Sequence, residues 1–350
     1  MVTIPILAMA TVLAIGQQAP PSHKPPTKAQ QAQQAREKAK QEAQAKTEQT
    51  LAVQVALHRA GFSTGVIDGR GGVNTTRALE AYRQQNGSDP APSGQPLIPY
   101  QITDQDAAGP FEQIPSDMME QSKLEVLSYQ SVAELLAERF HTTPQVLKTL
   151  NPNATMAAGE SINVPNVEPF ALPTKEMSMR PKEAASKPVG TTGRGDPKKP
   201  ATAAAPAPAA AQKPPVTITV SRSQSSVTVT GEDGKVLFFG PVTTGSEHDP
   251  LPLGDWKVTG IYFAPPFGYN PDLFWDANPA HTKATIPPGP NGPVGVVWID
   301  LSKEHYGIHG TPEPSTIGRT QSHGCVRLTN WDATRVALLA SPGTAVRFVE

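Results

Sequence analysis

The single cysteine of the chain, Cys325, ends the polar sequence Ser322-His323-Gly324-Cys325, and a second histidine, His309, precedes this sequence. A cysteine that attacks a carbonyl needs a base that forms the thiolate and hydrogen-bond donors for the developing oxyanion. A free thiol titrates near ~8.5, so a neighbouring imidazole matters for attack near neutral pH. Twelve residues separate His309 from Ser322, and a loop of this length can bring both ends to one site. These residues predict a thiol nucleophile at Cys325 with His309 as the candidate general base.

The alternative interpretation is that Cys325 is a buried, inert side chain, which is common for an isolated cysteine, and that the histidines are structural. The polar neighbours and Gly324 indicate an exposed turn instead, where the missing side chain lets the backbone approach a substrate. A strand-like sequence, residues 306–308, leads directly to His309. We therefore favour a nucleophilic site over a structural cysteine.

Two segments carry a resemblance to a known family. They are His309-Gly310-Thr311 and Ser322-His323-Gly324-Cys325-Val326-Arg327-Leu328. This pattern resembles the signature of the L,D-transpeptidases with a YkuD-type catalytic domain, and the resemblance extends over residues 216–349, the size of one domain. It implies a catalytic domain over residues 216–350 that is β-rich and β-sandwich-like with a helix, and that needs no cofactor and no metal.

The resemblance also implies roles for individual residues. The backbone carbonyl of Gly310 would orient the His309 ring. The segment of His323, Gly324 and Cys325 would shape the oxyanion region with its backbone N–H groups.

Ser322 and Arg327 are the candidate substrate-binding residues. Ser322 would also hold the loop, and the guanidinium of Arg327 would bind a carboxylate of a stem peptide, because the two groups are geometrically matched. A structural salt bridge is the alternative for Arg327. Asn330 is expected only to cap a helix that runs through Val336 and Leu339.

The substrate that the resemblance implies is a tetrapeptide stem of peptidoglycan, cleaved after its third, L-centred residue. The acyl group would pass through a thioester on Cys325 to a stem amine, which forms a 3→3 cross-link, or to a protein lysine, which anchors a protein to the wall. Water as the acceptor would make the enzyme an L,D-carboxypeptidase or wall hydrolase. The resemblance also implies acylation by carbapenems. The intact Cys325, His309 and His323 argue against a third reading, a non-catalytic wall-binding protein.

Composition limits the remaining possibilities. A chain of 350 residues with 38 prolines and few aromatic residues is expected to hold two or three domains and segments that bury no core. A net charge of −1 argues against nucleic acid as a partner. One cysteine excludes an intrachain disulfide framework, and metal-binding Cys-x-x-Cys pairs are absent from the sequence.

The first residues predict export to the periplasm or cell wall. Residues 2–15 are apolar and shorter than the roughly 20 residues that span a bilayer, and a small-x-small pattern ends at Gly16. A secretory signal over residues 1–16 is the favoured interpretation, and an uncleaved membrane anchor is the alternative. No Lys or Arg precedes the apolar run. Residues 17–49 are expected to be a spacer with partial helicity.

Two small modules are predicted before the catalytic domain. Residues 50–87 indicate a helix, a glycine-rich turn and a second helix capped by Asn74, which resembles a three-helix peptidoglycan-binding domain; a helical hairpin without a ligand is the alternative. Residues 124–166 indicate a strand near 126–129, a helix that begins at a capping box of Ser131 and Glu134, a second helix that begins at Thr143-Pro144, and a final strand. This α+β pattern resembles LysM, a glycan-binding module. A degenerate LysM that serves only as a spacer is the alternative.

Two further segments are expected to shape access to the substrate. Residues 167–215 are rich in Pro, Ala, Lys and Thr, and predict an extended linker that raises the effective concentration of wall substrate at the catalytic domain, or an inert hinge. Residues 263–293 are rich in Pro, Gly and Asn and carry several aromatic residues. We interpret this long loop as a flap over the acyl-donor groove, with the covering of a sheet face as the alternative.

Overall fold

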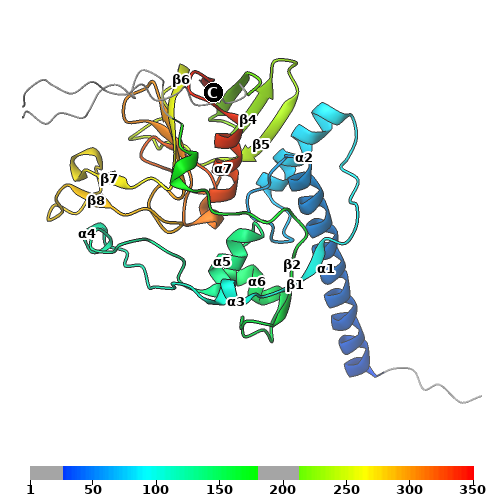
Figure 1. Cartoon of the computed structure of the whole chain (residues 1–350). Coiled ribbons are helices and arrows are strands. Elements are labelled where there is room, and N and C mark those ends of the chain that lie inside the picture. The colour runs from blue at the N-terminus through cyan, green and yellow to red at the C-terminus, as the bar shows by residue number, and fades with distance from the viewer. Residues whose placement is uncertain (1–26, 180–212) are drawn as a thin grey trace, which may run out of the picture. The chain divides into compact units, whose positions relative to one another are not determined.

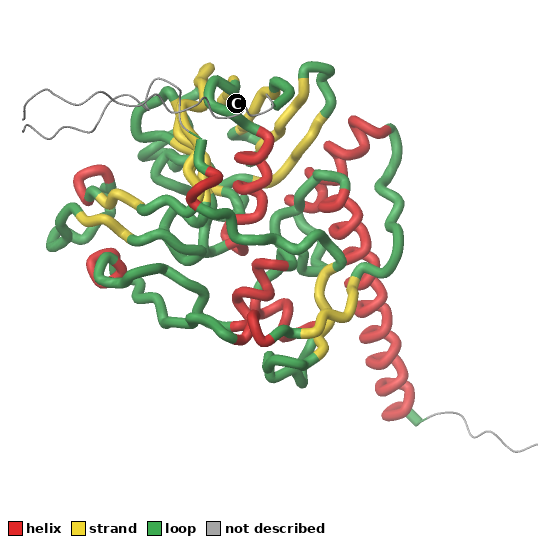
Figure 2. The backbone as a smooth tube through the Cα atoms, viewed as in Figure 1, coloured by secondary structure: helices red, strands yellow, loops and turns green. Residues whose placement is uncertain are grey.

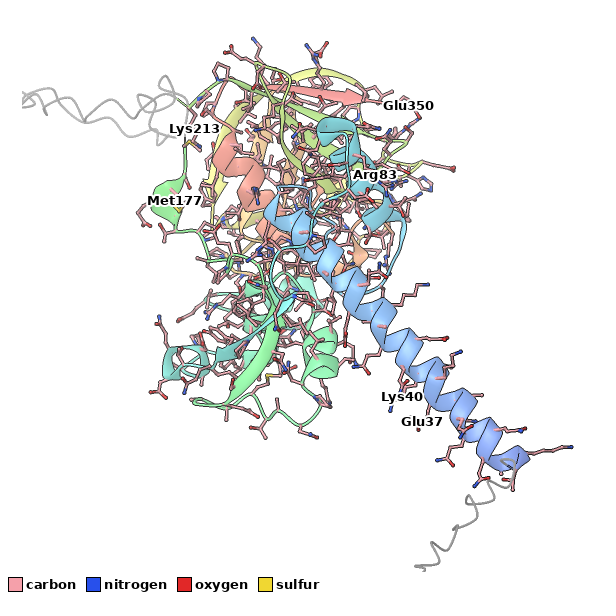
Figure 3. All side chains as sticks on the ribbon, turned by 90° about the vertical axis from the view of Figure 1, so that its right-hand side faces the viewer. Glu37, Lys40, Arg83, Met177, Lys213 and Glu350 are labelled. Carbon is pink, nitrogen blue, oxygen red and sulfur yellow. The ribbon has the colours of Figure 1, made fainter. Side chains whose placement is uncertain are left out.

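The computed structural model describes residues 27–179 and 213–350, and the chain divides into two compact units, Met1–Ala45 and Lys46–Glu350. Helix α1 (Lys28–Arg59) begins in the predicted spacer and continues into the predicted first module (Figure 1). The side chains of Glu37 and Lys40 on α1 are exposed (Figure 3). Among the described residues, no helix has the length and apolarity needed to cross a membrane. The apolar run over residues 2–15 lies outside the described residues.

The predicted catalytic domain is built on one eight-stranded sheet, so the sandwich-like arrangement predicted for it is corrected to a single curled sheet. Figure 2 shows the strands in yellow and the loops that join them in green. The order across the sheet is β11-β10-β9-β6-β12-β3-β4-β5. Two strand pairs, β3–β12 and β10–β11, are parallel, and the other pairs are antiparallel. The strands are β3 (Val216–Ser221), β4 (Ser226–Gly231), β5 (Val236–Pro241), β6 (Gly254–Phe263), β9 (Val297–Leu301), β10 (Gly307–His309), β11 (Val326–Arg327) and β12 (Ala345–Val349).

Helix α7 (Asn330–Leu339) packs its apolar side chains into the core of this sheet. Thr329 is the N-cap, because its hydroxyl accepts a hydrogen bond from the Asp332 N–H at 3.2 Å. The cap predicted at Asn330 is therefore wrong: Asn330 is the first helical residue and its side chain is fully buried. Burial of an amide side chain requires hydrogen-bond partners, and the partners of the Asn330 side chain are Val296, Pro290 and Glu138.

The first predicted module consists of the C-terminal part of α1, a turn around Gly65 and Gly69, and helix α2 (Val73–Asn86). Residues 50–87 thus hold two helices. The predicted cap of the second helix is corrected, because Gly72 occupies the N-cap and Asn74 lies inside the helix, where its amide donates to the Ile317 carbonyl at 3.1 Å.

The second predicted module is a two-stranded sheet, β1 (Leu97–Gln101) with β2 (Ser161–Pro165), and two helices, α5 (Val132–Arg139) and α6 (Pro144–Leu150). Its helices begin at Ser131 and Thr143 as predicted. The strand predicted near residues 126–129 is wrong, because the strand that pairs with β2 comes from residues 97–101. Its identity as a LysM module stays a prediction.

An insertion of residues 102–131 therefore separates β1 from α5. It carries the one-turn helices α3 (Asp104–Ala107) and α4 (Met118–Gln121). The long loop of the catalytic domain forms a hairpin of β7 (Phe267–Tyr269) and β8 (Ala284–Ile286). Three 3-10 turns complete the described elements: η1 (Lys175–Met177), η3 (Pro271–Leu273) and η4 (Pro314–Thr316).

Buried polar contacts join both modules to the catalytic domain within the unit of residues 46–350. The Ser63 hydroxyl donates to the Asp332 carboxylate at 2.8 Å, and the Asn330 amide donates to the Glu138 carboxylate at 2.7 Å. The beginning of the predicted linker also contacts the sheet, because the backbone of Met179 pairs with Ile261. Most of that linker, residues 180–212, lies outside the described residues; Met177 and Lys213 are labelled on its two sides (Figure 3).

Candidate active site

The parallel pair β10–β11 brings the two halves of the motif together. Its register aligns Ile308 with Val326 and His309 with Arg327. Side chains alternate between the two faces of a strand, so His309 and Arg327 share one face. Cys325 lies two residues before Arg327 at the entry to β11, and it belongs to the same face. The pairing of β10 with β11 thus brings the His309 imidazole close to the Cys325 thiol and the Arg327 guanidinium, which follow it by 16 and 18 positions in the sequence.

The chain segment at Thr243 and Thr244 holds the motif from its other side. The backbones of Thr243 and Arg327 exchange hydrogen bonds of 3.0 and 2.9 Å, and the Ser322 N–H donates to the Thr244 carbonyl at 3.0 Å. The Ser322 hydroxyl is buried and donates to the Cys325 carbonyl at 2.6 Å. This contact closes the turn that presents the sulfur. The Ser322 side chain is not part of the cavity wall. A direct contact of Ser322 with substrate stays a prediction.

His309 is held in one tautomer. Its Nδ1 lies 2.7 Å from the Gly310 carbonyl, which can only accept, so Nδ1 carries the proton and Nε2 carries the lone pair. The indole of Trp298 stacks on the ring, with centroids 5.5 Å apart. Burial lowers the pKa of His309 to about 3, and the charge of Arg327 acts in the same direction. The ring is therefore a neutral proton acceptor at neutral pH.

The thiol is also neutral at rest. Burial raises the pKa of Cys325, while the Gly307 N–H and the charge of Arg327 act in the opposite direction. The sulfur lies 3.8 Å from the His305 carbonyl and donates to it. Among the contacts of the described residues there is no hydrogen bond between Sγ and His309.

Arg327 carries a positive charge without a close protein counter-ion. Its guanidinium lines the same cavity as Cys325 and His309. No carboxylate of the described residues forms a salt bridge with it, and Glu313 and Asp276 act on it only at longer range. A partly buried cation without a partner is costly. A carboxylate ligand would supply the missing partner, which favours the substrate-binding interpretation over a structural salt bridge.

His323 lines the cavity, and Gly324 precedes Cys325 in a close contact with Tyr306. His323 Nε2 pairs with the Asp276 carboxylate at 2.8 Å, and Phe274 packs edge-on against its ring at 5.2 Å. Both partners belong to the loop of residues 263–293, so this loop reaches the catalytic motif. Gly324 has a φ of 100°, and a Cβ there would lie 2.7 Å from the Tyr306 ring. Only glycine satisfies both conditions.

A cavity of about 1510 Å³ opens above these residues. Its walls come from the motif, from the hairpin loop 263–293, and from three residues of the insertion in the second module, Ser116, Asp117 and Met118. Among the described residues, no group of three or more His, Cys, Asp or Glu side chains is arranged to hold a metal ion.

Sequence reasoning missed the support behind His309. The Oδ1 of Asn330 accepts from the Val296 N–H at 3.2 Å, and its Nδ2 donates to the Pro290 carbonyl at 3.1 Å and to Glu138. A Cβ on Gly310 would lie 2.1 Å from that Oδ1, so the amide packs directly against the residue that orients His309.

Glu138 comes from α5 of the second module and is buried. Its carboxyl also accepts a hydrogen bond from the Tyr129 hydroxyl. Burial raises the pKa of Glu138 to about 7, against the lowering effect of these two donors. No local pattern in the sequence signals a contact between Glu138 and Asn330, because 192 positions separate them.

Comparison with known proteins identifies the domain that carries this site. Residues 215–348 match the model of the YkuD family, the L,D-transpeptidase catalytic domain. This match confirms the family predicted for the catalytic domain.

Individual relatives match over shorter stretches. The YkuD protein of Bacillus licheniformis, which carries an L,D-transpeptidase name, is 51% identical over 59 residues, 17% of this chain and 36% of that protein. YqjB of Bacillus subtilis, named in the same way, is 30% identical over 120 residues, 33% of this chain and 60% of that protein. The chain spans about a third of the length of the YkuD relatives it matches. A crystal structure of L,D-transpeptidase 3 from Mycobacterium tuberculosis has a TM-score of 0.32 and 20% identity, covering 39% of this chain and 62% of that chain.

Proposed function

We propose that this protein is a peptidoglycan L,D-transpeptidase that transfers an acyl group from a tetrapeptide stem, through a thioester on Cys325, to an amine. The observation that carries this proposal is the shared cavity of Cys325, a neutral His309 held by Gly310, and an Arg327 that forms no salt bridge with any described residue. A thiol, a base with a free lone pair and a carboxylate-binding cation are the groups that acyl transfer from a peptide with a free carboxylate requires.

The acylation step follows from this geometry. Arg327 binds a carboxylate of the donor and places the scissile carbonyl over the sulfur. Cys325 rotates from the His305 carbonyl, its proton passes to Nε2 of His309, and Sγ forms a bond to the carbonyl carbon. Backbone N–H groups of the segment 323–325 stabilise the oxyanion, each contributing about 2.7–4 kcal/mol. The carbon–nitrogen bond then breaks, His309 returns the proton to the leaving amine, and the thioester remains.

Deacylation repeats the sequence with an amine acceptor. His309 takes a proton from the acceptor nitrogen as it attacks the thioester carbonyl, the carbon–sulfur bond breaks, and the thiolate recovers the proton. Because both resting groups are neutral, proton transfer accompanies bond formation in each step. Attack by water through the same route would release a tripeptide, the outcome of an L,D-carboxypeptidase.

The rest of the chain fits a wall enzyme. We propose that the protein is exported to the periplasm or cell wall by its N-terminal apolar segment. We also propose that the modules of residues 50–87 and 124–166 bind peptidoglycan, with the glycan as the ligand of the second module.

Mass spectrometry of purified protein incubated with disaccharide-tetrapeptide tests the function. We expect a thioester adduct on Cys325 and cross-linked dimers, with tripeptide as a minor product. Cys325→Ala is expected to abolish both while binding to isolated sacculi persists. Full activity of Cys325→Ala would refute the mechanism, and tripeptide as the main product with every amine tested would make the protein a hydrolase.

A further inference from the structure

The insertion of residues 102–131, which belongs to the second module, forms part of the wall of the catalytic cavity. Ser116, Asp117 and Met118 line the same cavity as Cys325. None of the three is buried, so each leaves part of its surface exposed in the cavity wall. This cavity is larger than the roughly 300–1,000 Å³ of ordinary small-molecule sites. It therefore has room for more of a substrate than the groups around the scissile bond.

Backbone hydrogen bonds attach the insertion to the hairpin loop. The Leu127 N–H donates to the Pro288 carbonyl at 2.9 Å, and the Asn291 N–H donates to the Leu127 carbonyl at 3.0 Å. A Cβ on Gly289 would lie 2.1 Å from that carbonyl, so glycine is required for this close approach. Leu127, where a strand was predicted, is instead the residue that attaches the insertion to the catalytic domain. Its side chain forms a buried apolar cluster with Tyr269 and Ile286, and Met118 and Met119 pack against this cluster.

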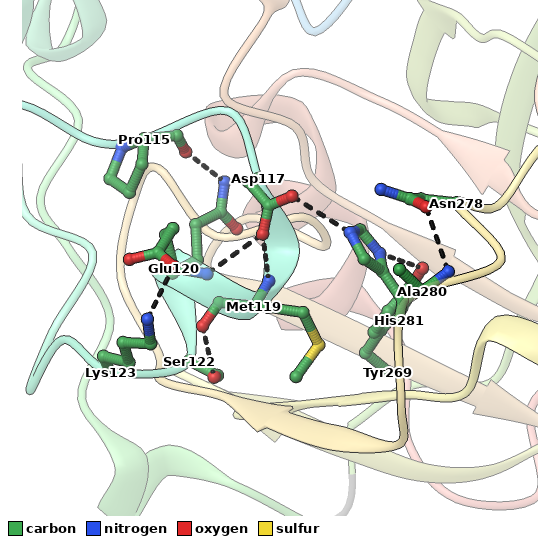
Figure 4. Close-up of polar contacts among 11 residues, drawn as sticks. Pro115, Asp117, Met119, Glu120, Ser122, Lys123, Tyr269, Asn278, Ala280 and His281 are labelled. Atoms are coloured by element: carbon green, nitrogen blue, oxygen red, sulfur yellow. Dashed lines mark hydrogen bonds and ion pairs between the residues drawn. The ribbon is translucent and has the colours of Figure 1, made fainter.

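Asp117 connects the wall to the hairpin through polar contacts (Figure 4). Its Oδ1 accepts from the backbone N–H groups of Met119 and Glu120 at 2.8 and 3.1 Å. Its Oδ2 accepts from His281 Nε2 at 3.0 Å, and His281 Nδ1 lies 2.9 Å from the Tyr269 hydroxyl. One carboxylate thus caps α4 and fixes the hairpin at once.

The same hairpin loop also contacts the catalytic motif, at His323. Phe274 of the hairpin loop packs on both Tyr269 and His323, with ring centroids 5.8 and 5.2 Å away. A continuous series of contacts therefore runs from Asp117 to the catalytic motif along one wall of the cavity. The part of a donor that touches Asp117 lies several side chains away from the scissile bond.

We infer that Asp117 and Met118 are specificity-determining residues, which bind the part of the acyl donor remote from the scissile bond and make the enzyme prefer a glycan-linked stem to a free tetrapeptide. This inference rests on the proposed function. Its physical basis is that the second module completes the donor site within the same chain. The catalytic domain of residues 216–350 alone would lack this wall.

Acylation of Cys325 in the full-length chain, followed by mass spectrometry, tests the inference with two donors: disaccharide-tetrapeptide and free tetrapeptide. Asp117→Ala is expected to slow acylation by the disaccharide donor about tenfold, the effect of 1.4 kcal/mol of lost binding energy. A loss transmitted through the hairpin should slow acylation by both donors equally, so the ratio of the two acylation rates, which should fall about tenfold in favour of the free tetrapeptide, tests the inference. Glu120→Ala is the matched control, because Glu120 lies on the same helix and pairs with Lys123 outside the cavity wall.

Met118→Ala provides a second variant that leaves the contact between Asp117 and His281 intact, so a folding defect of Asp117→Ala does not decide the question. It should reduce the preference for the disaccharide donor in the same direction. Equal effects on both donors, or no effect on either, would overturn the inference while leaving the proposed function in place. A wild-type protein that iodoacetamide alkylates but neither donor acylates would overturn both.

Discussion

Replacement of Glu138 by glutamine should change how the stability of the protein depends on pH. Glu138 is buried between Tyr129 and Asn330, and burial raises its pKa from 4.5 to about 7. Glutamine keeps the shape and the acceptor for the Asn330 amide but cannot ionise. Glutamine also replaces the oxygen that accepts from the Tyr129 hydroxyl with an NH2 group, but this change does not depend on pH. The pH-dependent part of the difference between the two proteins therefore measures the cost of ionising Glu138.

The sign follows from proton binding. Between pH 4.5 and about 7 the unfolded chain loses the proton of Glu138 while the folded protein keeps it, so the free energy of unfolding of the wild type falls as pH rises. At about 1.4 kcal/mol for each tenfold change in the ionisation constant, the loss approaches about 3 kcal/mol. Glu138→Gln lacks this loss, so its stability relative to wild type should rise by that amount over this pH range.

Thermal unfolding of both proteins at several pH values between 4.5 and 8 measures the difference. A change of about 3 kcal/mol corresponds to roughly 5 °C or more in the relative melting temperature. Other buried groups, such as Asp332 and His58, titrate in both proteins, and their effects cancel in the difference. Glu120→Gln makes the same chemical change at an exposed site. Parallel curves for wild type and Glu138→Gln would refute the reasoning.

Two further predictions concern the motif. Gly324→Ala and Gly343→Ala both place a side chain at a φ near 100°, but only at residue 324 does the new Cβ meet a neighbour, the Tyr306 ring. We expect both variants to lose melting temperature from backbone strain, Gly324→Ala more because of this contact, and a fall of about 100-fold in Cys325 acylation only for Gly324→Ala. Equal acylation rates would show that the contact with Tyr306 is unimportant. Because burial raises the pKa of Cys325 above the usual value of a thiol, the rate of its alkylation by iodoacetamide should keep rising with pH beyond neutrality. A plateau below pH 7 would indicate a standing thiolate instead.

Local sequence patterns correctly predicted structural features, such as helix starts, that depend on contacts between residues close together in the sequence. The helix starts at Ser131 and Thr143 were predicted because capping side chains act within one turn. The strand near residues 126–129 was predicted from apolar side chains, but burial of Leu127 is satisfied by the hairpin of another domain. A run of apolar residues predicts that a segment is buried, but it does not predict which other segment packs against it.

The motif of residues 309–327 is where sequence by itself determined most about this protein. The identity and spacing of Cys325, His309 and Arg327 predicted that these side chains belong to one site, since two short parallel strands suffice to place them on one face. Tertiary structure alone decided what surrounds them. Asn330 and Glu138 support Gly310, and Asp117 lines the cavity, through contacts between residues far apart in the chain. Such contacts depend on how separately folded elements pack, which no periodicity or spacing within one segment encodes.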